Sequence, residues 1–280
     1  MFHLPVVDFQ SPTAPADFCR SLHETGFGVL KNHPLDQQQV EGIYAEWLAF
    51  FRSDAKEAYA QDPVKFDGYF STRISETAKN HQYKDVKEFF HIYPWGRYPA
   101  EVSDAARRYY LQGSALAATL LGWVEDHTPA DIKARYSMPL PDMLTGSDHT
   151  LLRVLHYPPL TGEEEPGAMR AAAHGDINLL TLLPAATEPG LQVLGKDGDW
   201  HDVPRDFGLL IVNIGDMLEE ASGGFYPSTV HRVLNPVGDA ARKSRVSLPL
   251  FLHPRREVVL SERHTVGSYF DERMRELRGP

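Results

Sequence analysis

The stretch Ala171-Ala-Ala-His174-Gly-Asp176-Ile-Asn-Leu-Leu-Thr-Leu-Leu183 sets a histidine and an aspartate two positions apart between two apolar runs. Residues i and i+2 of a β-strand point to the same face of a sheet, so an extended backbone here directs His174 and Asp176 the same way. His174 is the only one of the thirteen histidines that is followed two positions later by Asp or Glu. A Gly-Asp pair is also ordinary turn chemistry, but the apolar runs on both sides favour a position inside the fold over a surface turn.

A second histidine can complete a metal site with this pair. His231 lies in the apolar run 229–234, and a sheet that folds back on itself would bring it to His174 and Asp176. Two imidazoles and one carboxylate on one side of an ion leave its other positions open, which is the arrangement of non-haem Fe(II) oxygenases. The same ligands could also hold Zn²⁺ for hydrolysis by a metal-bound water. The sequence therefore predicts a metal triad made of His174, Asp176 and His231.

The texture of the chain changes at about residue 148. Before it, apolar residues at helical spacing predict helices over 14–25, 35–51 and 103–124, with Asp36 as a cap of the second. After it, short apolar runs separated by Gly, Pro and Asp predict strands at 151–157, 178–183, 191–194, 200–203, 209–214, 229–234, 245–251 and 258–260. Asp197-Gly198 predicts a two-residue hairpin turn. We expect a mainly β fold with a helical N-terminal half (α+β) and a double-stranded β-helix, or jelly-roll, core.

A basic and a hydroxyl side chain share one face of the run 245–251, which is expected to form one strand. Arg245 and Ser247 are two positions apart, so both side chains point the same way. A planar guanidinium fork beside a hydroxyl suits a carboxylate held in a partly buried pocket. Arg242 and Ser244 have the opposite parity and are expected to face outward if Arg245 faces inward.

Together these motifs resemble the isopenicillin N synthase-like family of 2-oxoglutarate- and Fe(II)-dependent dioxygenases, and the resemblance extends over nearly the whole chain. Leu155-His156-Tyr157-Pro158 is similar to the family's Asn-Tyr-Tyr-Pro motif. The other segments that resemble the family, besides the metal triad and the Arg-Val-Ser motif, are 4–9, 26–33, 85–90 and 212–218.

The resemblance implies an oxidoreductase that binds Fe(II) through the metal triad. It also implies that Arg245 and Ser247, helped by Tyr157, hold the distal carboxylate of the co-substrate 2-oxoglutarate. In such enzymes 2-oxoglutarate is decarboxylated to succinate and CO₂ while O₂ oxidises, most often by hydroxylation, a small organic substrate. The protein's part in this chemistry is to position the substrate and exclude water.

Two features of the sequence, one residue and one interval, depart from the pattern of the plant members. Leu155 stands where those enzymes carry Asn, which removes a polar contact near the co-substrate. The interval from His231 to Arg245 is longer than in the plant enzymes, and 235–240 is expected to form the extended turn that absorbs the difference.

The family pattern divides the chain into expected regions: an N-terminal region of the non-haem dioxygenase family (1–100), a helical connector (101–147), the jelly-roll core (148–256) and a C-terminal extension (257–280). A formal net charge of −10 argues against nucleic acid as a partner. The longest strongly apolar stretch, 115–124, is short of the roughly 18 residues that a membrane span needs. A single cysteine excludes an internal disulfide and, with no signal-peptide pattern at the start, favours the cytoplasm.

Other functions remain compatible with these residues. An Fe(II) oxidase of the same fold that does not use 2-oxoglutarate would employ Arg245 and Ser247 to hold a substrate carboxylate. A non-catalytic protein that binds a small acid would also retain them. Arg73 and Arg170 are further candidates to anchor an acidic substrate, and the aromatic segments 66–70 and 89–95 could line its entrance or simply pack on the core.

Overall fold

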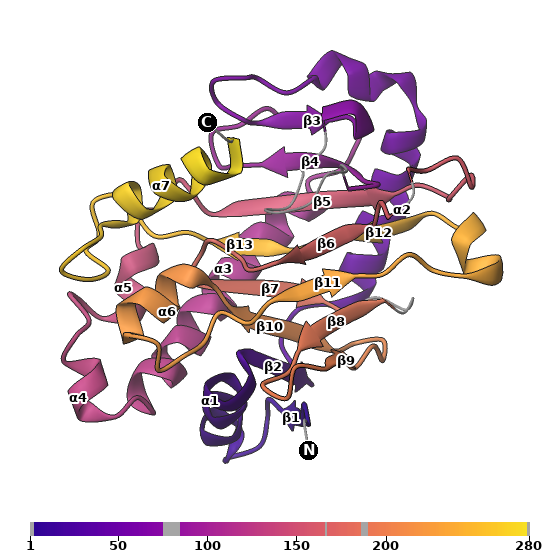
Figure 1. Cartoon of the computed structure of the whole chain (residues 1–280). Helices are drawn as coiled ribbons and strands as arrows, with labels where there is room; N and C mark the ends of the chain where they lie inside the picture. The colour runs from indigo at the N-terminus through magenta and orange to yellow at the C-terminus, as the bar shows by residue number, and fades with distance from the viewer. Residues whose placement is uncertain (1–2, 75–84, 166, 186–189, 279–280) are drawn as a thin grey trace.

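The computed structural model describes residues 3–74, 85–165, 167–185 and 190–278, and in them a smaller β-sheet lies across the face of a larger one (Figure 1). The larger sheet has the spatial order β1 (Val6–Asp8), β2 (Phe27–Lys31), β10 (Leu210–Ile214), β7 (Leu180–Pro184), β13 (Leu250–Leu252), β5 (Leu151–Tyr157), β4 (Glu88–Ile92) and β3 (Gly68–Phe70), with β12 (Arg245–Ser247) also paired to β5. The smaller sheet has the order β6 (Ala171–His174), β11 (His231–Val233), β8 (Leu191–Leu194) and β9 (Trp200–Asp202). This is a double-stranded β-helix, as the sequence predicts.

The helices lie outside the two sheets. Three helices that pack against the larger sheet are α1 (Ala14–Thr25), α2 (Gln37–Arg52) and α3 (Ala105–Asp126). Those gathered at the left of Figure 1 are α4 (Ala130–Lys133), α5 (Leu140–Leu144), α6 (Asp216–Ser222) and α7 (Val266–Arg278). Short 3₁₀ turns occupy Asp54–Tyr59, Thr72–Ile74 and Gly238–Arg242. Within the described ranges, the helices are too short or too polar to cross a membrane.

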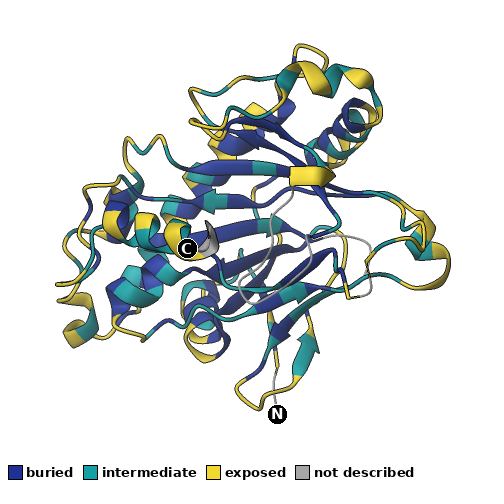
Figure 2. Cartoon of the chain, turned by 45° about the horizontal axis from the view of Figure 1, so that its top comes forward, coloured by how far each residue is buried: buried dark blue, intermediate teal, exposed yellow. Residues whose placement is uncertain are grey.

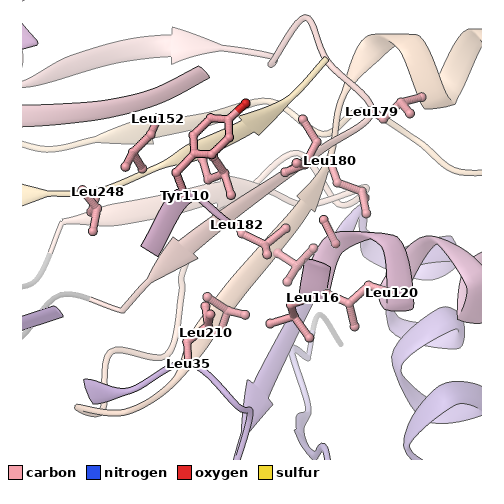
Figure 3. Packing of buried hydrophobic residues seen from close by; sticks show 14 of the residues in the cluster. Leu35, Tyr110, Leu116, Leu120, Leu152, Leu179, Leu180, Leu182, Leu210 and Leu248 are labelled. Atoms are coloured by element: carbon pink, nitrogen blue, oxygen red, sulfur yellow. The ribbon is translucent and has the colours of Figure 1, made fainter. Parts of the chain in front are cut away.

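Side-chain alternation along β10 shows how the larger sheet separates two interiors. Leu210, Val212 and Ile214 face the helices and join a large apolar cluster, part of which Figure 3 shows. Ile211 points the other way, into a second cluster between the sheets. Asn213 has the same parity as Ile211 and is also buried. The strand is therefore buried on both faces, as are the central strands around it (Figure 2).

Most elements predicted from local pattern are present. The three predicted helices correspond to α1, α2 and α3, and the side chain of Asp36 accepts a hydrogen bond of 2.8 Å from the backbone N–H of Gln38. The predicted strands at 151–157 and 191–194 have the bounds of β5 and β8. Capping side chains and apolar periodicity are local signals, which explains why these elements are readable from the sequence.

The predicted strand 245–251 is divided in two. β12 pairs with β5, whereas β13 pairs with both β5 and β7, so the chain shifts between strands around Pro249. Proline has no N–H to donate to a ladder, which accounts for the break.

Three other expectations also differ from the structure. Residues 258–260 form no strand and contribute one isolated bridge, between Val259 and Thr265. The β8–β9 hairpin is real, with Gly198 at φ 85°, but its connection spans 195–199 instead of two residues. The first half is less purely helical than predicted, because β1 to β4 widen the larger sheet at both edges.

Candidate active site

The two histidines of the metal triad face each other across paired strands. His174 ends β6 and His231 begins β11, and the antiparallel register sets them directly opposite. Their ring centroids are 4.5 Å apart. The sheet thus folds back as the sequence analysis requires, and the pairing of two strand ends brings together imidazoles that are distant in sequence.

Asp176 joins them from a loop. The prediction that it shares a strand with His174 is wrong, since β6 ends at His174 and residues 175–176 lie beyond it. Its Oδ1 nevertheless lies 3.8 Å from Nε2 of His174 and 3.7 Å from Nε2 of His231. The ligand atoms of these three residues all lie within 4.8 Å of one another. Because Asp176 is buried, the Gly175-Asp176 pair does not form a surface turn.

The remaining polar atoms of the metal triad are bound to the protein. Nδ1 of His174 donates to the carbonyl oxygen of Ala172 (2.7 Å), and Nδ1 of His231 donates to that of Thr229 (3.2 Å). A proton on Nδ1 leaves the lone pair on Nε2, so both rings present an acceptor nitrogen toward Asp176. The tautomer of each histidine is therefore the one that a metal ion needs.

The carboxylate of Asp176 is oriented in the same manner. Its Oδ2 accepts hydrogen bonds from Oγ1 of Thr181 (2.5 Å) and Nδ2 of Asn213 (2.8 Å). Asn178 in turn donates to Oγ1 of Thr181 (2.9 Å). Two donors on Oδ2 leave Oδ1 for the ion. The sequence analysis did not identify these supporting residues.

Electrostatics favour the metal-binding protonation states. Desolvation, reinforced by the neighbouring His231, lowers the pKa of His174 to about 4. Burial by itself would raise the pKa of Asp176, but the two histidines and the hydrogen bonds from Asn213 and Thr181 outweigh it and lower that pKa. At neutral pH the site therefore offers a neutral imidazole at His174 beside a carboxylate. Two nitrogens and one hard oxygen fit Fe(II).

Arg245, Ser247 and Tyr157 lie together on neighbouring strands. In the β5–β12 pair, Arg245 is opposite Tyr157 and Ser247 is opposite Leu155, so all four side chains have the same parity. The guanidinium carbon of Arg245 lies 5.7 Å from the centre of the Tyr157 ring. Arg245, Ser247 and Tyr157 are buried. A buried guanidinium beside two hydroxyls is suited to a carboxylate.

A cavity of about 120 Å³ reaches this group from between the sheets. Arg245 lines it, together with aliphatic side chains that include Leu183, Leu191 and Ile211 from strands of both sheets. Arg205 and Asp202 also line the cavity, so its mainly apolar wall carries two cations and one acid. A cationic group in a mainly apolar wall matches a short molecule with a carboxylate at its end and methylene groups behind it.

Leu155, which stands at the position of the family's Asn, belongs to an apolar cluster. It is buried with Phe70, Phe89 and Tyr157. The ring centroids of Phe70 and Phe89 are 4.7 Å apart and the rings are stacked. The segments 66–70 and 89–95 therefore extend the sheet beside β5 through β3 and β4. The rings of Phe70 and Phe89 continue the side of β5 that carries Tyr157, whereas Tyr69 and Phe90 belong to the apolar cluster on the helix side.

The additional arginines have different positions. Arg73 is exposed on the 3₁₀ turn Thr72–Ile74. Arg170 is fully buried, and its Nη2 donates to the carbonyl oxygen of Lys243 (3.2 Å). Its guanidinium carbon lies 5.5 Å from the centre of the Tyr157 ring. Arg153, which the sequence analysis did not single out, lies 4.5 Å over the Phe89 ring, and its Nε donates to His91 (2.9 Å).

Similarities to known proteins agree with this site. Residues 148–254 match the profile of the 2OG-Fe(II) oxygenase superfamily, and residues 4–110 match that of the non-haem dioxygenase in morphine synthesis N-terminal family. A crystal structure of a Shewanella oneidensis protein, described as an oxygenase, is 53% identical, covers 100% of both chains and has a TM-score of 0.91.

More distant similarities are of sequence in one case and of fold in another. The 2-oxoglutarate-dependent dioxygenase 11 of Oryza sativa subsp. japonica is 27% identical over 92% of this chain and 73% of its own length. A Neurospora crassa protein crystallised with alpha-KG and thymine is 22% identical, with a TM-score of 0.79 over 97% of this chain and 96% of its own, a likeness of fold.

The fold and the His-Asp-His site define a non-haem iron oxygenase, and the similar proteins identify the family within that class. The chain belongs to the superfamily of 2-oxoglutarate- and Fe(II)-dependent oxygenases, and within it to the isopenicillin N synthase-like type. It is a dioxygenase and an oxidoreductase that uses Fe(II), 2-oxoglutarate and O₂.

Proposed function

We propose that the metal triad binds the Fe(II) and that Arg245, Ser247 and Tyr157 hold the distal carboxylate of 2-oxoglutarate, so that the enzyme hydroxylates a small organic molecule. The observation that carries this proposal is the division of roles within the metal triad. Each ligand has one atom within 4.8 Å of the others, while the second polar atom of each side chain is hydrogen-bonded to the protein. Such preorganisation is expected of a metal site.

The remaining residues are assigned from chemistry. When bound, Fe(II) together with 2-oxoglutarate and O₂ supplies the oxidant. Arg245 neutralises the buried carboxylate of the co-substrate, and hydroxyl groups of Ser247 and Tyr157 can donate to the same carboxylate. The aliphatic side chains along the cavity keep water from the methylene groups of 2-oxoglutarate. No general base is assigned, because hydrogen abstraction from carbon needs none.

We place the substrate beside the aromatic cluster of Phe70 and Phe89, on the side of β5 that carries Tyr157. Phe251 relates this region to the metal triad. The guanidinium carbon of Arg153 lies 5.4 Å from the centre of the Phe251 ring, and Phe251 is opposite Thr181, which donates a hydrogen bond to Asp176. An apolar aromatic surface with two nearby cations, Arg153 and Lys87, is suited to a small planar molecule, and thymine, found with the Neurospora crassa relative, is one example. The cytoplasm stays a prediction from cysteine content.

The test is an anaerobic titration of the metal-free protein with Fe(II) and then with 2-oxoglutarate, followed by visible absorption. We expect a weak charge-transfer band that needs both additions and is lost in Arg245→Ala. Binding of iron without this band would favour the oxidase that uses no 2-oxoglutarate. Failure to bind iron would contradict the proposal and reopen the zinc and non-catalytic alternatives.

A further inference from the structure

A chain of buried and half-buried polar side chains lies on the opposite face of β5 from Tyr157. Nδ1 of His156 is 2.7 Å from Oε1 of Glu88, and Nε2 of His156 is 3.1 Å from Oγ of Ser244. Ser244 immediately precedes Arg245. The chain thus begins on β4, crosses β5 and ends beside the residue that we assign to the co-substrate carboxylate.

Glu88 is fixed at the other end of this chain. Its Oε2 accepts a hydrogen bond from Nζ of Lys56 (3.0 Å) and another from the hydroxyl of Tyr69. Nζ of Lys56 also donates to the carbonyl oxygen of Phe51 (2.7 Å), and the Phe51 ring stacks on His156 with centroids 5.4 Å apart. Both carboxylate oxygens are bonded, and the imidazole can rotate in neither direction without losing contacts.

The strand registers place this chain one row from the co-substrate anchor. Glu88 is opposite His156, and His156 is opposite Val246; in the next row Tyr157 is opposite Arg245. Adjacent residues of a strand point to opposite faces, so His156 reaches the helix side while Tyr157 faces the interior between the sheets. Movement of His156 or Ser244 therefore shifts the backbone from which Tyr157 and Arg245 extend.

We propose that His156, held by Glu88 and bonded to Ser244, is a positioning residue that sets the Arg245–Tyr157 anchor for 2-oxoglutarate. The N-terminal region then contributes to co-substrate affinity, because Glu88, Lys56 and Tyr69 all belong to it. This inference rests on the proposed function. Carboxylate recognition by a guanidinium is directional, so small displacements of the fork weaken it.

The test compares single-site variants of the whole chain. Ser244→Ala removes one hydroxyl, and Ser244→Thr restores it. His156→Phe retains an aromatic ring against Phe51 but can form neither hydrogen bond. Ser137→Ala is the matched control, since the Ser137 hydroxyl also makes one hydrogen bond, of 2.7 Å to the carbonyl oxygen of Val259, outside the sheets.

The readouts are the Kd of 2-oxoglutarate from the charge-transfer band, the Kd of Fe(II), and the Tm. We expect Ser244→Ala and His156→Phe to raise the Kd of 2-oxoglutarate about tenfold, by analogy with small displacements of other positioned groups. The Kd of Fe(II) should stay within about twofold of wild type. Ser244→Thr and Ser137→Ala should bind 2-oxoglutarate like wild type.

Three possible results distinguish failure of this inference from failure of the proposed function. If the wild type forms the band but Ser244→Ala binds 2-oxoglutarate unchanged, the positioning role is wrong, even if the Tm falls. If the Kd values of Fe(II) and 2-oxoglutarate rise together, the effect is general loosening, and the role is again wrong. If the wild type forms no band at all, the proposed function itself fails.

Discussion

Asn213→Ala should weaken Fe(II) binding although Asn213 is not a metal ligand. Its Nδ2 donates to Oδ2 of Asp176 at 2.8 Å and is one of two donors to that oxygen, the other being Thr181. Asn213 is 3% exposed, so water cannot readily replace the lost donor. With one donor gone, Thr181 alone holds Oδ2, so the carboxylate is oriented less firmly with Oδ1 toward the two histidines.

The size of the effect follows from two independent considerations. A hydrogen bond to a charged group contributes about 1.5–3 kcal/mol. Loss of a partner that orients a metal ligand typically weakens metal affinity by about 10–100-fold, which corresponds to about 1.4–2.7 kcal/mol. The two ranges agree, and Thr181 still bonds the same oxygen. We therefore expect a Kd of Fe(II) about tenfold above that of wild type.

The assay is anaerobic competition for Fe(II) between the protein and a coloured chelator of known affinity. Ile211→Ala is the matched control, because Ile211 is buried on the same face of the same strand and contacts no metal ligand through a hydrogen bond. Both variants should lose stability through the cavity that they create, by about 2–4 kcal/mol for the isoleucine. An Asn213→Ala protein that binds Fe(II) as tightly as wild type, or no more weakly than Ile211→Ala does, would refute the assigned role of Asn213.

Further outcomes are expected at the metal, the co-substrate anchor and the buried carboxylate. His174→Ala should abolish substrate-dependent succinate release while its circular dichroism stays native, and wild-type turnover in a metal-checked sample would contradict the metal assignment. Arg245→Ala should retain Fe(II) binding and raise the Kd of 2-oxoglutarate about a hundredfold or more, because a buried carboxylate loses its charged partner; equal affinities for 2-oxoglutarate would contradict this. Burial would raise the pKa of Glu88, but hydrogen bonds from His156, Tyr69 and Lys56 lower it overall. Ionised Glu88 therefore stabilises the fold at pH values above its unfolded pKa, and this contribution is lost as the pH falls through the lower folded value. The difference in urea midpoint between wild type and Glu88→Gln should accordingly shrink from about pH 5 to pH 3, and a constant difference would argue against an ionised Glu88.

The three residues of the metal triad could be predicted largely because His174 and Asp176 are only two positions apart in the sequence. Asp176 lies in a loop, yet its two-residue offset from His174 still brings the two side chains together. Their proximity thus depends on nearness in sequence and not on the predicted strand. His231 required the long-range pairing of β6 with β11, which the alternation of short strands suggested but could not fix in register.

The supporting residues were missed although a signal existed. Asn213 interrupts the apolar run 209–214, and a polar side chain at the inward parity of a strand buried on both faces requires a partner. The partner could not be named, because Asp176 is distant in sequence and the β10–β7 register is not a local property. The same reason hid β3 and β4, which are short and join the edge of the sheet through the pairing of β4 with β5.

β5 is the element on which these separate sites converge. Its side facing the smaller sheet carries Tyr157 for the co-substrate and Leu155 for the aromatic cluster, while His156 between them points to the helices. Leu155 is compatible with this arrangement because its neighbours Phe70 and Phe89 are apolar, and an amide buried there would need a polar partner. The position that resembles the family's Asn is thus part of an apolar wall. Orientation of the co-substrate anchor then falls to the opposite face of the strand, where Glu88 and Ser244 bind the imidazole of His156.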